Sequence, residues 1–448
     1  MKRWLRFGGK NPRDSHGVGE GIGVDRLYPF FKMNQKILDA AEHAEDMVCP
    51  QMQAIEENTE YNQQKMLAAF IKNGVSESHF MASTGYGYGD RGRDTLDRVF
   101  ADALGAEDAL VRHNFVSGTH ALTVALFGVL RPGDTMLSVT GIPYDTLRSV
   151  IGLTGNGIGS LKEYGIRYEQ VDLTPEGKPD YEEIERRIHP GIKMVYLQRS
   201  RGYSLRPSLF VEDIEKISQI AKSKAPNCIV MVDNCYGEFV QREEPVSRGA
   251  DLMAGSLIKN PGGGVAPTGG YIAGKKELVE MCSYRLTTPG TGREIGATLG
   301  NNRELFMGAF HAPHVTGEAL KTAVFTAALF QHLGYQVTPK YDEPRADIIQ
   351  SLLLENEKAL IAFCQGVQKG SPVDSFVVPE PWDMPGYDCK VIMAAGAFTL
   401  GASIELSADA PLREPYAVWM QGGLNYHSGR LGAMLAAQSM LEQGFLKE

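Results

Sequence analysis

One lysine of this sequence is placed where its amine would be shielded from water. Lys259 follows an apolar run and precedes an asparagine, a proline and three glycines in the stretch GSLIKNPGGG. A lysine amine removed from water can attack carbonyl groups and form a Schiff base. Lys259 is therefore the first candidate for a catalytic residue.

Asp233 ends the apolar stretch NCIVMVD, which has the composition of a buried strand. Ligands of parallel sheets bind beyond the carboxyl ends of the strands, so Asp233 would face a ligand. Taken alone, this aspartate could equally cap a helix or bind a metal ion. Lys259 lies 26 residues further along the chain and three residues after Ser256, and this combination favours a catalytic role for Asp233.

A phosphate site is indicated by Ser117, Gly118 and Thr119, where the stretch NFVSGTHALTVALF passes from a strand-like run into an apolar helix. The first amides of a helix have no partner within the helix, and the positive end of the helix dipole attracts anions. Gly118 would permit close approach of a ligand. The alternative is that Ser117 or Thr119 only caps the helix.

Together, these three stretches predict a site for pyridoxal 5'-phosphate and no metal site. Lys259 would hold the aldehyde of the cofactor as a Schiff base and, once released, would carry protons as a neutral base. Asp233 would keep the pyridine nitrogen protonated, so that the ring accepts electrons from a substrate carbanion. Tyr144, in the stretch TGIPYDTL, could stack on the ring of the cofactor, or it could be an ordinary aromatic residue packed in a loop.

The elements that would position these residues alternate between short apolar strands and amphipathic helices. Such alternation predicts an α/β fold with a mostly parallel sheet and helices on both faces. The expected strands cover residues 107–112, 135–139, 193–198, 227–234 and 269–274, and the helices between and beside them include 94–106 and 211–223.

The pattern of predicted helices and strands changes after about residue 310. Long helical patterns cover residues 316–334, 345–370 and 428–443, and strand-like runs cover 389–401 and 402–407. We therefore expect three parts, namely an N-terminal helical segment (1–65), a large cofactor-binding domain (66–310) and a smaller α+β domain (311–448).

Composition narrows the possible partners. The 448 residues carry 45 basic and 54 acidic side chains, and the net charge of -9 argues against nucleic acid or an anionic membrane as a partner. No run of apolar residues reaches the length of a membrane span. The six cysteines are scattered without a C-x-x-C pair, which is typical of reduced thiols in a cytoplasmic protein. A small molecule is the expected ligand.

The chain resembles the fold type I pyridoxal phosphate enzymes, and in particular the methionine gamma-lyase and cystathionine lyase group with its divergent branch of aluminium resistance proteins. In that group a serine–glycine turn holds the phosphate, a tyrosine stacks on the ring, an aspartate meets the ring nitrogen, and a serine precedes the lysine by three positions. The matching residues here are Ser117, Gly118, Thr119, Tyr144, Asp233, Ser256 and Lys259.

The resemblance also implies an assembly with shared active sites. The stretch STGYGYGDRGRDTLDRVF is similar to the family segment that reaches the phosphate of a neighbouring subunit through a tyrosine and an arginine, here Tyr88 and Arg91. A homodimer would then be the smallest working unit, and a homotetramer is the common form. Without a partner, this glycine-rich stretch would be only a mobile connector.

The activity implied by the resemblance is a carbon–sulfur lyase reaction, by β- or γ-elimination, on a sulfur amino acid such as cystathionine, cysteine or methionine. Arg413 would bind the substrate carboxylate, although it could instead form a surface salt bridge. Two departures from the better-known lyases are the glycines after Lys259 and the lack of an evident asparagine in YLQRSRGYSLRP. The alternatives are transamination, retro-aldol cleavage or a weakly catalytic stress protein that binds the cofactor.

Overall fold

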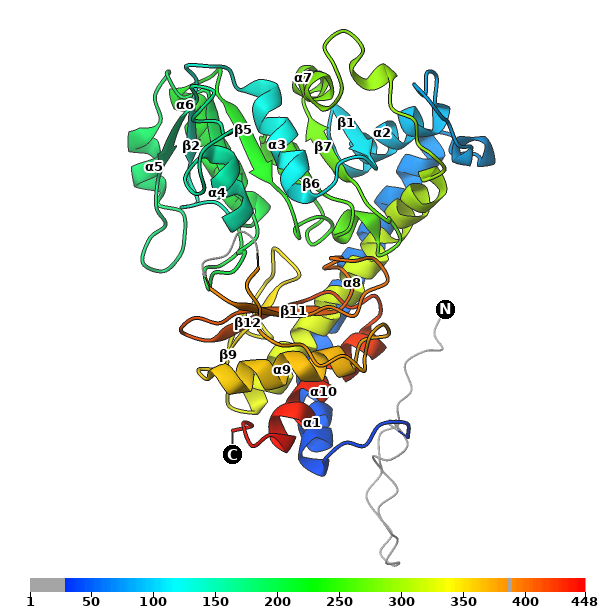
Figure 1. Cartoon of the computed structure of the whole chain (residues 1–448), viewed down its shortest axis with the longest axis vertical. Coiled ribbons are helices and arrows are strands. Elements are labelled where there is room, and N and C mark those ends of the chain that lie inside the picture. Colours follow the sequence, from blue (N-terminus) through cyan, green and yellow to red (C-terminus); the bar gives the residue numbers. More distant parts are fainter. Residues whose placement is uncertain (1–28, 385–388, 448) are drawn as a thin grey trace, which may run out of the picture.

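A computed structural model describes residues 29–384 and 389–447, which form two sheets connected by long helices (Figure 1). The larger sheet has seven strands in the order β1-β7-β6-β5-β4-β2-β3. Strand β7 is antiparallel to both of its neighbours, and the other pairs are parallel. This confirms the expected mostly parallel sheet. The strands are β1 (Asp108–Arg112), β2 (Thr135–Ser138), β3 (Arg167–Gln170), β4 (Met194–Gln198), β5 (Ile229–Asp233), β6 (Leu252–Ser256) and β7 (Gly270–Gly274).

Helices cover both faces of this sheet because its central strands are apolar on both sides. In β4, Met194 and Tyr196 contact one hydrophobic core, and Val195 and Leu197 contact the other. The first core is closed by α3 (Gly118–Val129), α4 (Asp145–Ile151) and α7 (Lys276–Leu286). The second is closed by α2 (Arg91–Leu104), α5 (Tyr181–Arg187), α6 (Val211–Lys224) and the beginning of α8 (Asn302–His332).

The smaller sheet is entirely antiparallel, with the order β10-β11-β12-β9-β8. Helices α9 (Glu357–Lys369) and α10 (Tyr426–Glu442) pack on it and bury a separate hydrophobic core. This arrangement confirms the expected small α+β unit. Its strands are β8 (Gln336–Thr338), β9 (Gln350–Leu353), β10 (Val391–Ala394), β11 (Ser407–Pro411) and β12 (Ala417–Gln421).

The predicted helix at 345–370 is wrong in its first half. Residues 350–353 form β9, which pairs with both β8 and β12. Helix α9 begins only after Asn356, whose side chain accepts hydrogen bonds from the amides of Lys358 and Ala359. Periodicity alone cannot distinguish a short apolar run in a helix from a buried strand. Here the pairing with two neighbouring strands and the cap at Asn356 determine that the strand comes first and the helix begins after it.

Two long helices connect the sheets. Helix α1 (Gln35–Lys72) packs along α8, and Figure 1 shows both running from the large sheet at the top to the small sheet below it. The domain border that we propose near residue 310 therefore falls inside a continuous helix. Of the expected N-terminal segment, residues 1–28 lie outside the described residues. Among the helices that are described, none combines the length and apolar content needed to cross a membrane.

Candidate active site

Lys259 lies in a tight turn after the last residue of β6. Its amide donates a hydrogen bond to the carbonyl of Ser256 (3.3 Å), and a short 3₁₀ helix follows at Asn260–Gly262. The Lys259 Nζ atom lies 3.9 Å from the centroid of the Tyr236 ring, within the range of a cation–π contact. Strand β6 therefore delivers the lysine to the carboxyl edge of the parallel part of the sheet.

The glycines after Lys259 serve to pack this turn against helix α8. A Cβ atom on Gly262 would lie 1.6 Å from the carbonyl oxygen of Leu257, and one on Gly263 would lie 2.4 Å from that of Gly308. Gly263 also has a φ of 56°, which side chains disfavour. The glycines after Lys259 therefore allow the close backbone contacts that hold the Lys259 turn in place.

Asp233 ends β5 and lies beside β6 in the sheet. Its side chain is 7% exposed, and its Oδ1 atom accepts a hydrogen bond from the Cys235 amide (3.1 Å). Burial raises the pKa of Asp233, and the charge of Lys259 opposes that rise. The two predicted catalytic residues are therefore brought within electrostatic contact, and a carboxylate at this position requires a cationic partner.

The Lys259 amine is surrounded by acidic groups in the cofactor-free protein, and its expected role as a neutral base after release from the cofactor stays a prediction. Burial disfavours its charge, but the acidic groups around it outweigh burial and raise its pKa above the ordinary value. These groups are Cys235, Tyr236, Asp233 and Glu238, and each of them attracts the amine only when it is ionised. To act as a nucleophile, Lys259 must therefore first transfer a proton to one of its neighbours or to a ligand.

The predicted phosphate turn lies at the beginning of α3. Ser117 caps this helix, since its Oγ atom accepts a hydrogen bond from the His120 amide (3.0 Å). Capping leaves the amides of Gly118 and Thr119 without a partner inside the helix. Ser117 thus caps the helix, its part in binding phosphate stays a prediction, and the two neighbouring amides are further groups that could bind an anion.

Ser256 connects the phosphate turn to the lysine. A Cβ atom on Gly118 would lie 3.2 Å from the Cβ atom of Ser256 and 3.5 Å from the Sγ atom of Cys235. The Ser256 Oγ atom is buried and has no hydrogen-bond partner among the described residues. An unpaired buried hydroxyl has a free-energy cost, so this atom fits a bound acceptor such as a phosphate oxygen.

The close packing at Gly118 makes its replacement a direct test of this turn. A valine there would add methyl groups beside Ser256 and Cys235, whereas an alanine adds only its Cβ atom, 3.2 Å from Ser256 and 3.5 Å from Cys235. We expect Gly118→Val to raise the dissociation constant of pyridoxal phosphate at least ~10-fold, or ~1.4 kcal/mol, and Gly118→Ala to raise it less. Titration of the cofactor-free proteins measures both, and equal affinities in the two variants and the parent would remove Gly118 from the site.

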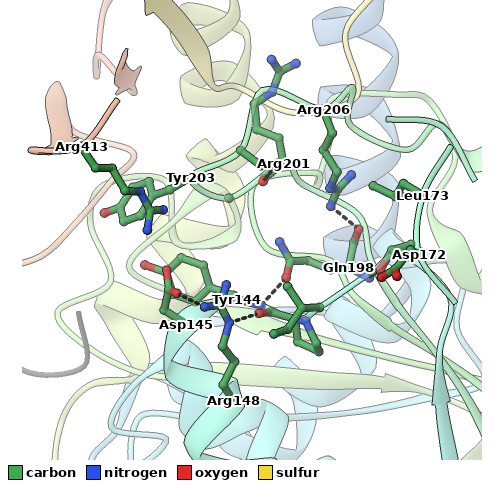
Figure 2. Close-up of a pocket in the computed structure, with 16 residues that line it drawn as sticks. Tyr144, Asp145, Arg148, Asp172, Leu173, Gln198, Arg201, Tyr203, Arg206 and Arg413 are labelled. Atoms are coloured by element: carbon green, nitrogen blue, oxygen red, sulfur yellow. Dashed lines mark hydrogen bonds and ion pairs between the residues drawn. The ribbon is translucent and has the colours of Figure 1, made fainter. Parts of the chain in front are cut away.

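Tyr144 and Arg413 line one cavity between the two sheets (Figure 2). Tyr144 precedes α4, and its amide donates a hydrogen bond to the Gln198 side chain (2.7 Å) at the end of β4. The hydroxyls of Thr119 and Thr146 lie 2.7 Å apart and connect the beginnings of α3 and α4. Arg413 is exposed and follows β11 in the smaller unit. The structure thus brings Arg413 and Tyr144 to one cavity, while Ser117, Gly118, Thr119, Asp233 and Lys259 are not part of its lining.

Tyr88 and Arg91 lie on the surface of the chain. Tyr88 is 67% exposed and stacks on Tyr86, with ring centroids 5.5 Å apart, and Arg91 is the exposed first residue of α2. The loop that carries them is not a free connector, because Arg93 donates hydrogen bonds to the carbonyls of Gly87 and Gly296. The backbone beside Tyr88 is therefore held in place, and the role of Tyr88 and Arg91 in a neighbouring site stays a prediction.

The family follows from comparison with known proteins. The profile of the methionine gamma-lyase family matches residues 37–441. The chain belongs to the methionine gamma-lyase family. Members of this family depend on pyridoxal phosphate. The L-methionine gamma-lyase of Treponema denticola is 27% identical over 213 residues, which cover 47% of this chain and 49% of that enzyme.

Relatives with higher sequence identity have less specific functional descriptions. The uncharacterized protein YnbB of Bacillus subtilis is 51% identical over 390 residues, covering 87% of this chain and 93% of YnbB. A solved structure from Clostridium novyi, described as a carbon-sulfur lyase involved in aluminum resistance, is 50% identical with a TM-score of 0.89, covering 94% and 99% of the two chains. The pyridoxal phosphate-dependent protein YhfS of Escherichia coli shares the fold alone, at 16% identity and a TM-score of 0.57.

In this member of the methionine gamma-lyase family, the turn after β5 holds residues that sequence reasoning missed. Tyr236 has a positive φ of 72°, an unusual conformation for a tyrosine, and Asn260 donates a hydrogen bond to its carbonyl (3.0 Å). The Tyr236 hydroxyl donates to Ser403 of the smaller unit (3.1 Å). The signal for them in the sequence was the position of the CYGEF stretch, which begins two residues after Asp233.

Glu238 is the buried acid of this turn. Its Oε1 atom accepts a hydrogen bond from the Tyr271 hydroxyl (2.8 Å), and its Oε2 atom has no partner among the described residues. Burial raises the pKa of Glu238 to about 8. A carboxyl group with such a pKa keeps its proton at neutral pH and lies within the electrostatic reach of Lys259.

The raised pKa of Glu238 predicts a pH-dependent stability. Between about pH 4.5 and pH 8 the folded state holds a proton that the unfolded state has released, so the free energy of unfolding falls as pH rises. Glu238→Gln cannot titrate and should lack this fall, so its stability relative to the parent should improve by roughly 4 kcal/mol between these pH values. Urea unfolding of the cofactor-free proteins at both pH values checks this, with the exposed Glu42→Gln as control. Parallel pH profiles for parent and Glu238→Gln would contradict the assignment.

Proposed function

We propose that this chain is a pyridoxal phosphate-dependent carbon–sulfur lyase that acts on a sulfur amino acid such as cystathionine, cysteine or methionine. The observation that carries the proposal is the electrostatic pairing of Lys259 with Asp233, beside the capped beginning of α3. The relationship to L-methionine gamma-lyase and to the Clostridium novyi carbon-sulfur lyase supports the reaction class.

The residues present fit the cofactor. Lys259 would hold it covalently, and Asp233 would pair with its ring nitrogen. The amides of Gly118 and Thr119, at the beginning of α3, and the hydroxyl of Ser256 would bind its phosphate, since the first amides of a helix have no partner within it and the Ser256 Oγ atom has none among the described residues. When bound, the cofactor supplies an electron sink that stabilises a carbanion at the α-carbon of the substrate.

The side chains of the protein then have distinct tasks, which we assign from their positions. Lys259 would move the proton from the α-carbon, because its amine is released when the substrate amine takes its place. Asp233 would stabilise the positive charge of the protonated ring nitrogen of the cofactor. Arg413 would hold the substrate carboxylate through two parallel hydrogen bonds. Tyr144 would fix the plane in which the reacting bonds lie. Cleavage of the carbon–sulfur bond with uptake of one water then gives a thiol, a 2-oxo acid and ammonia.

We also propose that the working unit is a homodimer or homotetramer with shared active sites. The exposed side chains of Tyr88 and Arg91 support this, because they project from a loop whose backbone is hydrogen-bonded to Arg93 and so can reach a neighbouring copy. The six free thiols support a reducing, cytoplasmic location.

The reaction is tested by supplying cystathionine, cysteine, methionine, alanine and threonine to the holoenzyme and measuring all possible products. We expect thiol, 2-oxo acid and ammonia in equal amounts from at least one sulfur amino acid. Transfer of the amino group from alanine to a 2-oxo acid, or aldehyde release from threonine, in the absence of thiol would replace the lyase with a transaminase or an aldolase.

A further inference from the structure

A second cavity lies between α1, α8 and the loop that connects β8 to β9. Its volume is about 310 Å³, which is near the lower end of the range for small-molecule sites. None of the residues to which we assign the cofactor or the substrate belongs to its described lining. This cavity is therefore separate from the proposed active site.

One wall of the second cavity is aliphatic. It is formed by Ile55 of α1, Leu320 and Val324 of α8, and Val240, which follows the turn after β5. Ile55 packs against two hydrophobic cores, so this wall is held from both sides. Such a wall favours an aliphatic group on any ligand that the cavity binds.

Arg345 lines the cavity with donors that are not all used. Its Nη2 atom donates a hydrogen bond to the Gln350 side chain (2.5 Å), but its buried Nε and Nη1 atoms have no hydrogen-bond partner among the described residues. Burial lowers the pKa of Arg345 to about 9, while the charges of Asp347 and Glu343 oppose this fall, so the side chain remains charged at neutral pH. A ligand carboxylate would supply the missing acceptors, because its two oxygens match the planar guanidinium.

Acceptor groups line the cavity beside this arginine. Asp342 and Glu343 are exposed and precede Arg345 in the same loop, and the Asp342 carboxylate forms no hydrogen bond or ion pair with another described residue. On α1, the Oε1 atom of Gln51 is buried and has no partner among the described residues. A carboxylate and an amide oxygen are suitable acceptors for an ammonium group.

We propose that the second cavity binds an aliphatic α-amino acid as a zwitterion. Its carboxylate would pair with Arg345, its ammonium group with Asp342 and Gln51, and its side chain would lie on the aliphatic wall. A simple carboxylic acid would meet the two acids of the loop without a compensating cation, and a simple amine would meet Arg345 without an anion, so the zwitterion is the best match. This site goes beyond the proposed function, since no bond is formed or broken in it.

The second cavity is connected to the proposed active site by two sets of contacts. Asp347, whose charge acts on Arg345, forms an ion pair with Arg201 (3.7 Å), and Arg201 lines the cavity that holds Tyr144 and Arg413. The core that contains Val240 and Leu320 also contacts Tyr236, whose ring lies against Lys259. An amino acid bound here is therefore placed to act on the active site without occupying it.

Calorimetry with L-leucine tests this site on the holoprotein after treatment with borohydride, which blocks the proposed active site. Leucine has no sulfur and is not a substrate of the proposed reaction. We expect one leucine to bind per chain with a dissociation constant below about 1 mM. L-Leucinamide, which lacks the carboxylate, and 4-methylpentanoate, which lacks the ammonium group, should each bind at least ~10-fold more weakly.

Two variants at exposed positions locate the bound leucine. Ala54→Phe fills the cavity from the surface of α1 and should abolish binding. Asp342→Asn removes the partner of the ammonium group and should reduce the preference for leucine over 4-methylpentanoate at least ~3-fold. Asp39→Asn, an exposed change near the beginning of α1, is the control and should leave all affinities unchanged.

Three results would overturn the proposal. The first is the absence of saturable leucine binding to the parent protein. The second is equal affinity for leucine, leucinamide and 4-methylpentanoate, which would leave only an apolar cavity. The third is unchanged binding in Ala54→Phe, which would place leucine elsewhere. The lyase reaction is tested separately by its products, so neither proposal depends on the other.

Discussion

Lys259→Ala is expected to abolish thiol release, with a loss of at least ~10⁴-fold in kcat/KM. The variant loses both the covalent attachment point of the cofactor and the group that moves the α-proton. It should also be colourless after incubation with pyridoxal phosphate and gel filtration, whereas the parent protein should be yellow. Absorbance spectra and product assays on the same preparations measure both effects.

The control for this variant is Lys358→Ala, which removes an exposed lysine at the beginning of α9. It should keep the colour and the activity of the parent. Retention of a substantial fraction of activity by Lys259→Ala would show that another group performs the chemistry, and the proposed function would then fail.

Asp233→Asn should lower kcat by roughly 10²–10³-fold, because an amide cannot stabilise a positive charge as a carboxylate does in a buried site. The change keeps the size of the side chain, and its Oδ1 atom could still accept the hydrogen bond from the Cys235 amide. We therefore expect a folded protein that still binds the cofactor and is slow in catalysis. Steady-state kinetics and cofactor titration separate these two effects.

Asp46→Asn, on the exposed surface of α1, is the matched control and should leave kcat unchanged. If Asp233→Asn lost cofactor binding and activity in equal measure, the carboxylate would act in binding and not in the chemical step. If neither changed, Asp233 would have no part in the site.

Local patterns in the sequence were sufficient to predict the positions of the main candidate residues. Asp233 was placed at a strand end because the preceding residues are apolar without alternation, as expected for a strand buried on both faces. Ser117 was recognised as the beginning of a helix by its residue type. Because parallel strands end at one edge of a sheet, these local predictions were enough to bring the residues together.

Other parts of the site depend on contacts that no local pattern encodes. The raised pKa of Glu238 arises from complete burial beneath the Lys259 turn, and the Tyr236 hydroxyl meets Ser403, which is 167 residues away. The raised pKa of Lys259 in the cofactor-free protein likewise depends on acidic groups that the fold gathers around one amine. The sequence alone assigned no role to Arg206, because only the fold shows that it lines the same cavity as Tyr144.

Reductive trapping of the cofactor tests the central claim most directly. The holoprotein is treated with borohydride, digested, and analysed by mass spectrometry to locate any lysine that carries a pyridoxyl group. We predict that the group is found on the peptide that contains Lys259 and on no other. A pyridoxyl group on a different lysine, or none after saturation with pyridoxal phosphate, would contradict the assignment of Lys259.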